Sequence, residues 1–328
     1  MLASIDLGLM YALMALGVYI TFRVLDFADL TVDGSFVTGA GIAATGILHG
    51  VSPVVATLLG FLAGCLAGVI TGLLNTVGKI NPLLAGILTQ IALYSINLRI
   101  MGRANLSLLG QSTLLSGMRN AHWFATWRSI LVFTAVALVF GAILTWFLLT
   151  NVGLGVQAAG NNATMARAQG IHTSGMIILG LALANGLVAI SGALVAQYQG
   201  FADISGGIGT IVMGLASVIL GQAIFGARPI WRAVLAVIAG SVLYRFVIQL
   251  ALNLHIGLQP TDMKVISAVL VIAALLIPRL PVFQQVARRR REAELAKQVL
   301  AADMAAAGRA GAQPGDPART TDVESVKP

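Results

Sequence analysis

Long apolar runs, separated by short polar stretches, make up most of the chain. Residues 34–78, 129–166 and 168–202 contain no Asp, Glu, Lys or Arg. A helix that crosses a bilayer needs about 20 consecutive apolar residues, so each run is long enough for at least one span. The pattern predicts an all-α, polytopic membrane protein with about nine transmembrane helices. We place these helices near residues 5–22, 34–49, 53–75, 83–101, 130–149, 174–197, 208–226, 231–250 and 264–279.

A polar segment interrupts this pattern after the first predicted helix. The sequence LDFADLTVDGSF, residues 25–36, holds Asp26, Asp29 and Asp33, which are half of the acidic residues that precede the basic C-terminal tail. The apolar runs beside it are short. The helix predicted from residue 34 to about 48 spans roughly 22 Å, less than the ~30 Å hydrocarbon core of a bilayer. We therefore predict a broken or re-entrant segment at this point.

Two interpretations of the polar segment remain open from the residues alone. In one, it is a solvated cytoplasmic turn, in which Asp33 or Ser35 caps the next helix and Asp29 or Thr31 closes an Asx-type turn. In the other, it is a break within the membrane that faces a central cavity. An Asp exposed to lipid would cost ~3 kcal/mol, so a carboxylate at that depth must face protein or water. The short flanking runs favour the second interpretation.

The third predicted helix carries a regular glycine pattern. Gly60, Gly64, Gly68 and Gly72 follow one another at a strict spacing of four residues. This spacing places all four on one face of a helix, where they form a smooth groove. Small residues at such spacing let membrane helices approach closely, so we expect another helix to pack there.

The basic charge is concentrated at the C-terminus. The net charge is +8, and eight of the twenty basic residues lie in residues 288–328, led by ARRRREAELAK. This is a membrane-flanking pattern and does not indicate nucleic-acid binding, and it places the tail on the cytoplasmic side of the lipid bilayer. We expect a transmembrane domain at residues 1–280 and a cytoplasmic basic helix with a disordered tail at 281–328. An odd number of spans then puts the N-terminus outside.

The residues provide no catalytic or metal-binding arrangement. The stretch GLLNTVGKI, residues 72–80, has the wrong glycine spacing for a phosphate loop and lacks its Ser or Thr. The four histidines are scattered, and the single cysteine, Cys65, has no metal-binding partner. We expect no metal, no cofactor and no enzyme activity in this chain.

The polar loop at residues 151–176 carries the signals of a short helix outside the bilayer. Asn161 or Asn162 can cap its first turn, the next residues are mostly good helix formers, and Gly170 is placed to end it. A solvated connector is one interpretation. However, such a connector needs no capped helix, and small side chains around Met165 would suit a groove on another protein. The segment comprises Asn161, Asn162, Ala163, Thr164, Met165, Ala166, Arg167, Ala168, Gln169, Gly170 and Ile171.

Three stretches resemble the permease subunits of bacterial ABC importers for ribose and branched-chain amino acids. They are GNNATMARAQGIHTSGM, LVAISGALVAQYQG and GLASVILGQAIFG, all between residues 151 and 226. The stretch DLTVDGS is similar to the Asp-Leu-Ser-Val-Gly-Ser segment of the sugar permeases, with Asp33 as an inserted residue. The fuller LDFADLTVDGSF is similar to a branch with amino-acid substrates, among which aromatic amino acids are candidates. The resemblance extends from residue 1 to about 280 and leaves the tail unmatched.

The resemblance implies a multi-pass permease in the bacterial inner membrane that forms a translocation path for an amino acid or a related small solute. The segment Asn161 to Ile171 would be the coupling helix, which sits in a cleft of a separate cytoplasmic ATPase subunit. Members of the family pair as dimers, here expected to be homodimers, and receive substrate from an extracytoplasmic binding protein. Arg103, Arg119 and Arg128 in the predicted outer loop would either contact that protein or anchor the chain at the membrane interface.

The polar segment after the first helix then has a functional interpretation. We expect Asp26, Asp29, Thr31, Asp33 and Ser35 to line the translocation path. An ion-driven secondary transporter is the alternative, because broken helices and intramembrane Asp residues are natural there too. No inverted repeat that would support the alternative is visible. The residues leave the identity of the substrate open.

Overall fold

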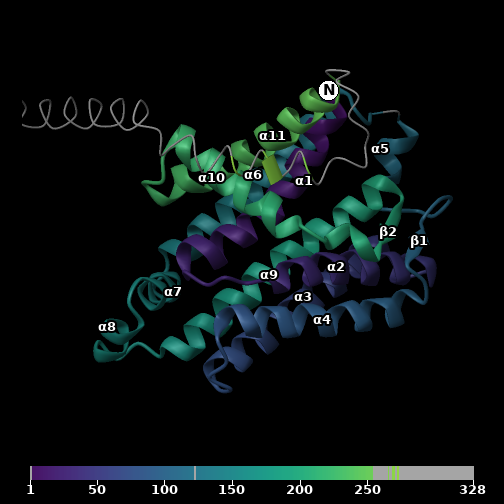
Figure 1. Cartoon of the computed structure of the whole chain (residues 1–328). Helices are drawn as coiled ribbons and strands as arrows, with labels where there is room; N and C mark the ends of the chain where they lie inside the picture. The colour runs from purple at the N-terminus through teal and green to yellow at the C-terminus, as the bar shows by residue number, and fades with distance from the viewer. Residues whose placement is uncertain (1, 122, 254–264, 266–267, 270–271, 273–328) are drawn as a thin grey trace, which may run out of the picture. The chain divides into compact units, whose positions relative to one another are not determined.

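The computed structural model describes residues 2–121, 123–253, 265, 268–269 and 272. They belong to one compact unit, Met1–Leu275, which is built almost entirely from helices (Figure 1). The predicted span at 264–279, apart from four described positions, and the predicted cytoplasmic segment at 281–328 lie outside the described residues.

The order of the elements follows the predicted order of helices. The first part holds α1 (Leu2–Val18), the π-helix η1 (Tyr19–Val24), α2 (Thr31–Leu48), α3 (Pro53–Thr76), α4 (Pro82–Met101), β1 (Asn105–Ser107), α5 (Ser116–Asn120) and α6 (Trp127–Leu149). The second part holds α7 (Asn151–Asn161), α8 (Ala163–Ala168), α9 (Thr173–Gln199), β2 (Phe201–Asp203), the 3-10 helix η2 (Ile204–Gly207), α10 (Thr210–Phe225) and α11 (Ile230–Asn253).

The prediction of an all-α, polytopic membrane protein is confirmed, with two additions. Within the described residues, seven helical segments are long and apolar enough to cross a membrane: Leu2–Val24, Pro53–Thr76, Pro82–Met101, Trp127–Leu149, Thr173–Gln199, Ile204–Phe225 and Ile230–Ala251. The strands β1 and β2 pair in a small antiparallel sheet, and α7 is a separate helix; the sequence had predicted neither. The count of nine transmembrane helices is not established by the described residues.

Helix α2 is largely buried within the bundle. It begins at Thr31, three residues earlier than predicted, and its 18 residues span about 27 Å. Its Gly, Ser, Thr and Asp content makes it less apolar than the seven segments named above, yet 14 of its 18 residues are buried. It packs against α3, α4 and α9, which screen its polar side chains from lipid. This burial explains how a helix of mixed polarity is accommodated within the apolar unit.

Helices α3 and α9 make the most extensive contact in the unit, and the glycines of α3 lie within it. A Cβ added at Gly64 would lie 2.6 Å from the carbonyl oxygen of Asn185, and one at Gly68 would collide with the carbonyl oxygen of Leu181. Gly72 faces Ile178 of α9 in the same way, whereas Gly60 faces Gly39 of α2. The smooth face therefore lies against backbone on two neighbouring helices.

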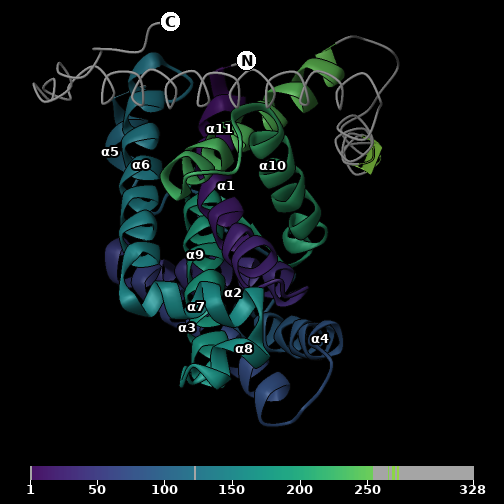
Figure 2. The same ribbon diagram turned by 90° about the vertical axis from the view of Figure 1, so that its left-hand side faces the viewer.

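The two ends of the helices carry different structures. The β1–β2 sheet and α5 lie at one end, whereas α7 and α8 lie at the other (Figures 1 and 2). The start of α1 is tied to the first end because the buried Asp6 carboxylate accepts hydrogen bonds from Ser129 Oγ at 2.8 Å and from the Ala125 N–H at 3.1 Å. The predicted orientation puts this end outside and the α8 end in the cytoplasm.

Candidate functional site

The connection between α1 and α2 is the predicted break. After η1, residues 25–29 have no regular structure and Leu30 is a turn. Asp26 adopts a left-handed conformation with φ of 51° and is exposed. A Cβ added at Gly86 of α4 would lie 2.7 Å from the Leu30 nitrogen. Because Gly86 is about one turn from the start of α4, the segment reaches about one turn into the bundle. The segment therefore lies near one end of the helices, as the interpretation as a turn predicts, but it also lies within the protein, as the interpretation as a membrane break predicts.

Asp29 is held inside the protein by two neighbours. Its side chain is 2% exposed. One carboxylate oxygen accepts the Thr31 backbone N–H at 2.9 Å, and the other accepts the Asn185 side-chain amide at 2.7 Å. The first contact is the backbone amide N–H at the start of α2. Free N–H groups at the positive end of a helix dipole are favourable partners for an anion. The second comes from the middle of α9, where no local pattern marks it.

Asn185 connects the break to the next turn of α2. While its amide nitrogen donates to Asp29, its side-chain oxygen accepts the Ser35 hydroxyl at 2.7 Å. Asn185 is fully buried, as is Ser35. One amide on α9 thus binds both Asp29 of the break and Ser35 of α2. Because each polar atom is partnered, the connection avoids the cost of an unpaired polar group in a dry interior.

Three hydroxyl groups join α2 to the two helices that follow it. The Thr31 and Thr71 hydroxyl oxygens lie 2.7 Å apart, and Thr71 donates to Thr89 at 3.0 Å. All three side chains are buried. The hydroxyls lie on α2, α3 and α4, so the start of α2 is fixed by side-chain hydrogen bonds from three other helices when Asn185 of α9 is included.

Asp33 binds a different element, the N-terminus of α10. One of its carboxylate oxygens accepts the Gly209 N–H at 2.9 Å. The other accepts the Thr210 hydroxyl at 2.9 Å and the Ile211 N–H at 2.8 Å. A carboxylate in this position satisfies free N–H groups and complements the helix dipole. Asp33 therefore caps a distant helix; the expectation that it caps its own helix is wrong.

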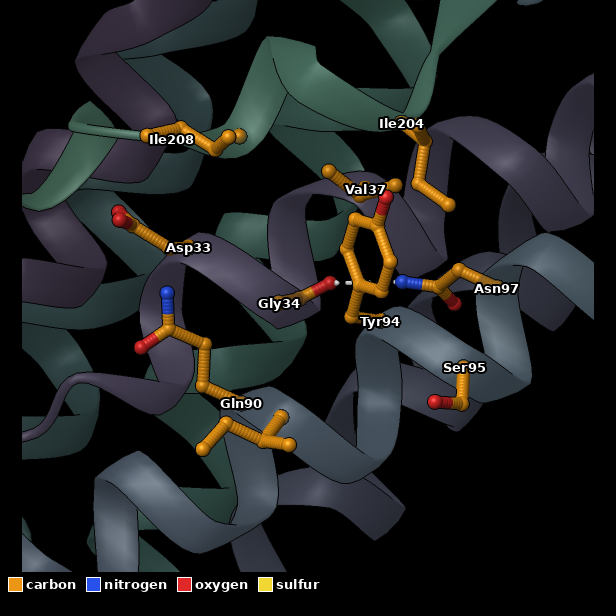
Figure 3. A pocket seen from close by; sticks show the side chains of 11 residues that line it. Asp33, Gly34, Val37, Gln90, Tyr94, Ser95, Asn97, Ile204 and Ile208 are labelled. Carbon is orange, nitrogen blue, oxygen red and sulfur yellow. Dashed lines mark hydrogen bonds between the residues drawn. The ribbon is translucent and has the colours of Figure 1, made fainter. Parts of the chain in front are cut away.

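A pocket opens beside Asp33, between α2, α4 and the segment that leads into α10 (Figure 3). Its volume is about 400 Å³. The Tyr94 ring projects into it, and Asn97 donates to the Gly34 carbonyl oxygen at 3.3 Å. The side-chain oxygen of Asn97 is buried without a partner among the described residues. Its lining comprises Asp33, Gly34, Val37, Gln90, Ile91, Tyr94, Ser95, Asn97, Ile204, Gly207 and Ile208.

The five residues predicted for a path separate into three groups. Asp33 lines the pocket, while Asp29, Thr31 and Ser35 are buried in the hydrogen-bond network behind it. Asp26 is exposed and belongs to neither arrangement. No sequence pattern pointed to Tyr94, Asn97 or Asn185 as site residues. Their helices read as plain apolar spans, and the only available signal was an uncharged polar residue within each.

The predicted loop helix is present as α8. Asn162 is its N-cap, and its side-chain oxygen accepts the Met165 N–H at 2.9 Å. Gly170 follows it with φ of 82°, a conformation suited to ending a helix. Met165 is 63% exposed, but Ala166 is only 4% exposed. The expectation that Ala166 belongs to an outward docking surface is therefore wrong, because its methyl group faces the chain's own interior.

The three arginines predicted to face outward differ in their contacts. Arg119 donates to the backbone carbonyl oxygens of Gln197 at 3.3 Å and Tyr198 at 3.5 Å, which anchors α5 to the end of α9. Arg103 and Arg128 are exposed, and the Arg128 guanidinium stacks over the Trp123 ring at 5.3 Å. Arg103 and Arg128 are thus available on the protein surface, whereas Arg119 is largely occupied by contacts within the fold.

The family assignment follows from comparison with known proteins. The model of the branched-chain amino acid transport system permease component matches residues 1–275. The chain belongs to this family. It is 40% identical over 268 residues to the tyrosine transport system permease protein of Clostridioides difficile (strain R20291), a match that covers 82% of this chain and 88% of that protein. It is also 34% identical over 279 residues to an uncharacterized protein of Rickettsia prowazekii (strain Madrid E), over 84% of this chain and 96% of that protein.

No solved structure matches the chain significantly. Family membership makes the chain an ABC-type transport permease, a multi-pass protein of the inner membrane, and it argues against the ion-driven alternative. The permease is a transport component and not a catalytic subunit, and its family implies association with an ATPase and a binding protein.

Proposed function

We propose that this permease forms the translocation path of an amino-acid importer and that tyrosine is its first candidate substrate. The observation that carries the proposal is the pocket beside Asp33. It combines the Tyr94 ring and apolar side chains with the Asn97 oxygen, which has no partner within the part of the chain that the structure describes. Its 400 Å³ falls within the range of small-molecule sites. The relative named for tyrosine transport, at 40% identity, supports this choice of substrate.

A second copy of the permease completes the path in this proposal. Helix α4 leaves Leu84, Leu88, Ile91 and Tyr94 exposed, and the last two also line the pocket. The spacing of these residues places them along one side of the helix. Burial of this apolar stripe against a second subunit would enclose the pocket at the centre of a homodimer.

Disulfide crosslinking tests the homodimer. We expect Ile91→Cys, in a Cys65→Ser background, to form a crosslinked dimer in native membranes under mild oxidation. Leu138→Cys, on the exposed face of α6, is the matched control and should crosslink poorly. Equal crosslinking at the two positions would show that the α4 stripe faces lipid.

The coupling role of Asn161 to Ile171 remains a proposal, with Met165 as its principal contact. The capped α8 lies at one end of the helices and presents Met165, a flexible apolar side chain suited to an apolar groove. Met165→Arg should abolish stimulation of the ATPase subunit while leaving the permease folded. Ser112→Arg adds the same charge at an exposed position of the opposite end and serves as the control. Unchanged affinity for the ATPase in Met165→Arg would contradict the assignment.

The binding protein is proposed to dock at the other end, against Arg103 and Arg128. Both guanidinium groups are exposed, and attraction to acidic groups would raise the association rate in a salt-dependent way. The double variant Arg103→Gln/Arg128→Gln should slow association at low salt more than at high salt. A salt-independent rate in the parent protein would exclude this role.

Transport in proteoliposomes tests the whole function. The permease is reconstituted with its cognate ATPase and binding protein, and uptake of labelled tyrosine is followed with and without ATP. We expect ATP-dependent uptake that excess unlabelled tyrosine, but not ribose, suppresses. ATP-independent uptake, or uptake of ribose alone, would overturn the proposal.

A further inference from the structure

A second polar cavity lies at the α8 end of the helices, away from the pocket beside Asp33. Its volume is about 780 Å³, and it is enclosed by η1, α7, α10 and the start of α11. Two arginines line it, Arg23 from η1 and Arg228 from the loop between α10 and α11, and no acidic residue is among the described residues of its wall. Neither arginine belongs to the proposed path or to the coupling segment, although Asn161 of that segment also lines the cavity.

An unpaired hydrogen-bond donor lies in the same wall. The side-chain nitrogen of Gln222 is buried and has no partner among the described residues. Gln157, by contrast, is already committed, because its amide nitrogen donates to the Leu148 carbonyl oxygen at 2.8 Å. A buried N–H without a hydrogen-bond partner costs free energy. A ligand that accepts a hydrogen bond from Gln222 would remove this cost. Two cations and a free donor together suit a phosphate group.

The polar cavity continues into an apolar groove. Leu149 and Trp231 line both the cavity and a groove of about 520 Å³ between α6 and α11. The rest of the groove is formed by Leu138, Gly141, Ala142, Thr145, Trp146, Val234 and Leu235. Trp146 is 70% exposed and Trp231 52% exposed. Trp146 lies near the C-terminal end of α6 and Trp231 near the N-terminal end of α11, so both are at the same end of the groove. Exposed tryptophans at this level are typical of the membrane interface.

From this continuity we propose that the chain has a binding site for an anionic glycerophospholipid. The phosphate lies in the polar cavity between Arg23 and Arg228, where Gln222 donates to it, and an acyl chain lies in the groove between α6 and α11. A free phosphate would leave the groove unused, whereas a lipid fills both parts. Basic pockets between transmembrane helices on the cytoplasmic side bind anionic headgroups in this way. The site joins five elements, η1, α6, α7, α10 and α11, and α7 leads directly into α8.

Quenching by brominated lipid tests the site. The variant Trp123→Phe/Trp127→Phe/Trp146→Phe leaves Trp231 as the single tryptophan. It is reconstituted into phosphatidylcholine vesicles that contain a minor fraction of either brominated phosphatidylglycerol or brominated phosphatidylcholine. We expect stronger quenching by the phosphatidylglycerol. Each arginine should contribute about a fivefold preference, so Arg23→Gln/Arg228→Gln should remove most of it.

The control is Lys79→Gln/Arg99→Gln, which removes two exposed charges outside the cavity and should keep the preference. Equal quenching by the two lipids in the parent would overturn the proposal. Inorganic phosphate should compete with the headgroup and weaken the preference, whereas binding of inorganic phosphate to the cavity together with equal quenching by the two lipids would assign it to a free anion and overturn the proposal. So would arginine variants that keep the lipid preference but lose the ATPase subunit, because the cavity would then be part of that interface.

Discussion

The two sides of α2 are built in opposite ways, although they share one short polar segment. Toward α9, the side chains of Asp29 and Ser35 are dry and fully partnered through Asn185. Toward α4 and α10, Asp33 and Gly34 border a pocket in which the oxygen of Asn97 has no partner among the described residues. Saturated polar networks stabilise one arrangement, whereas an unpaired group is available to a ligand. From this contrast we infer a structural role for the α9 side, whereas the binding role proposed above belongs to the side that faces α4 and α10.

The largest effect is expected where α3 meets α9. A Leu side chain at position 68 would collide with the Leu181 carbonyl oxygen, so Gly68→Leu must push the helices apart. Overpacking of this kind costs about 3 kcal/mol or more where backbone blocks the space. Ala135→Leu, at an exposed position of α6, is the control. The thermal midpoint in detergent should fall strongly only for Gly68→Leu; equal midpoints would show that the glycine face tolerates bulk.

Local signals and distant contacts explain what the sequence could and could not reveal. The cap at Asn162 and the ending at Gly170 depend on neighbours within a few residues, so the loop helix could be predicted to within about three residues at each end; Asn161, however, belongs to α7. The glycine spacing indicated close packing but could not name α9 as the partner. Asp29 and Asn185 are 156 residues apart, and no periodicity connects them. The orientation of Ala166 failed for the same reason, since it depends on tertiary contacts.

The second prediction breaks the dry side chemically. In Asp29→Asn, the new amide can accept from Thr31 or from Asn185 but not from both, which leaves two donors facing each other. The loss should be about 1–3 kcal/mol of stability, with reduced transport. The swap Asp29→Asn/Asn185→Asp restores a donor–acceptor pair between the two positions, and the new carboxylate still accepts the Ser35 hydroxyl. It loses the hydrogen bond from the Asn185 amide to the Leu181 carbonyl oxygen at 3.0 Å, so partial recovery of both thermal midpoint and uptake is the expected result. Full activity of the single variant would indicate an ordinary solvated turn.

The third prediction concerns Asp33, where the two sides meet. Asp33→Asn keeps an oxygen for Thr210 and Ile211 but presents an amide to the Gly209 N–H. One lost cap bond should cost only ~1 kcal/mol of stability. Because the side chain lines the pocket, uptake should fall by more than the thermal midpoint suggests. Asp203→Asn alters an exposed cap on Ser205 and should leave uptake unchanged. Small losses of uptake that are similar in the two variants would show that Asp33 acts only as a helix cap.

The smallest effect on stability, and the sharpest test of the binding side, is expected at Asn97. Its amide gives the Gly34 carbonyl oxygen one long hydrogen bond of 3.3 Å, and the Thr38 hydroxyl donates to the same oxygen at 2.9 Å. In Asn97→Ala, that carbonyl oxygen keeps its hydrogen bond from Thr38. The removed amide has an oxygen without a partner among the described residues, so little stabilisation is lost and the thermal midpoint should barely move. The pocket proposed to hold the substrate would lose one acceptor. The KM for uptake should then rise between about twofold and tenfold, the worth of one neutral hydrogen bond, with kcat nearly unchanged. Gln111→Ala, at an exposed position remote from the pocket, should alter neither quantity. A lowered midpoint with an unchanged KM in Asn97→Ala would show that Asn97 only stabilises the fold. The two sides of α2 would then have the same structural role.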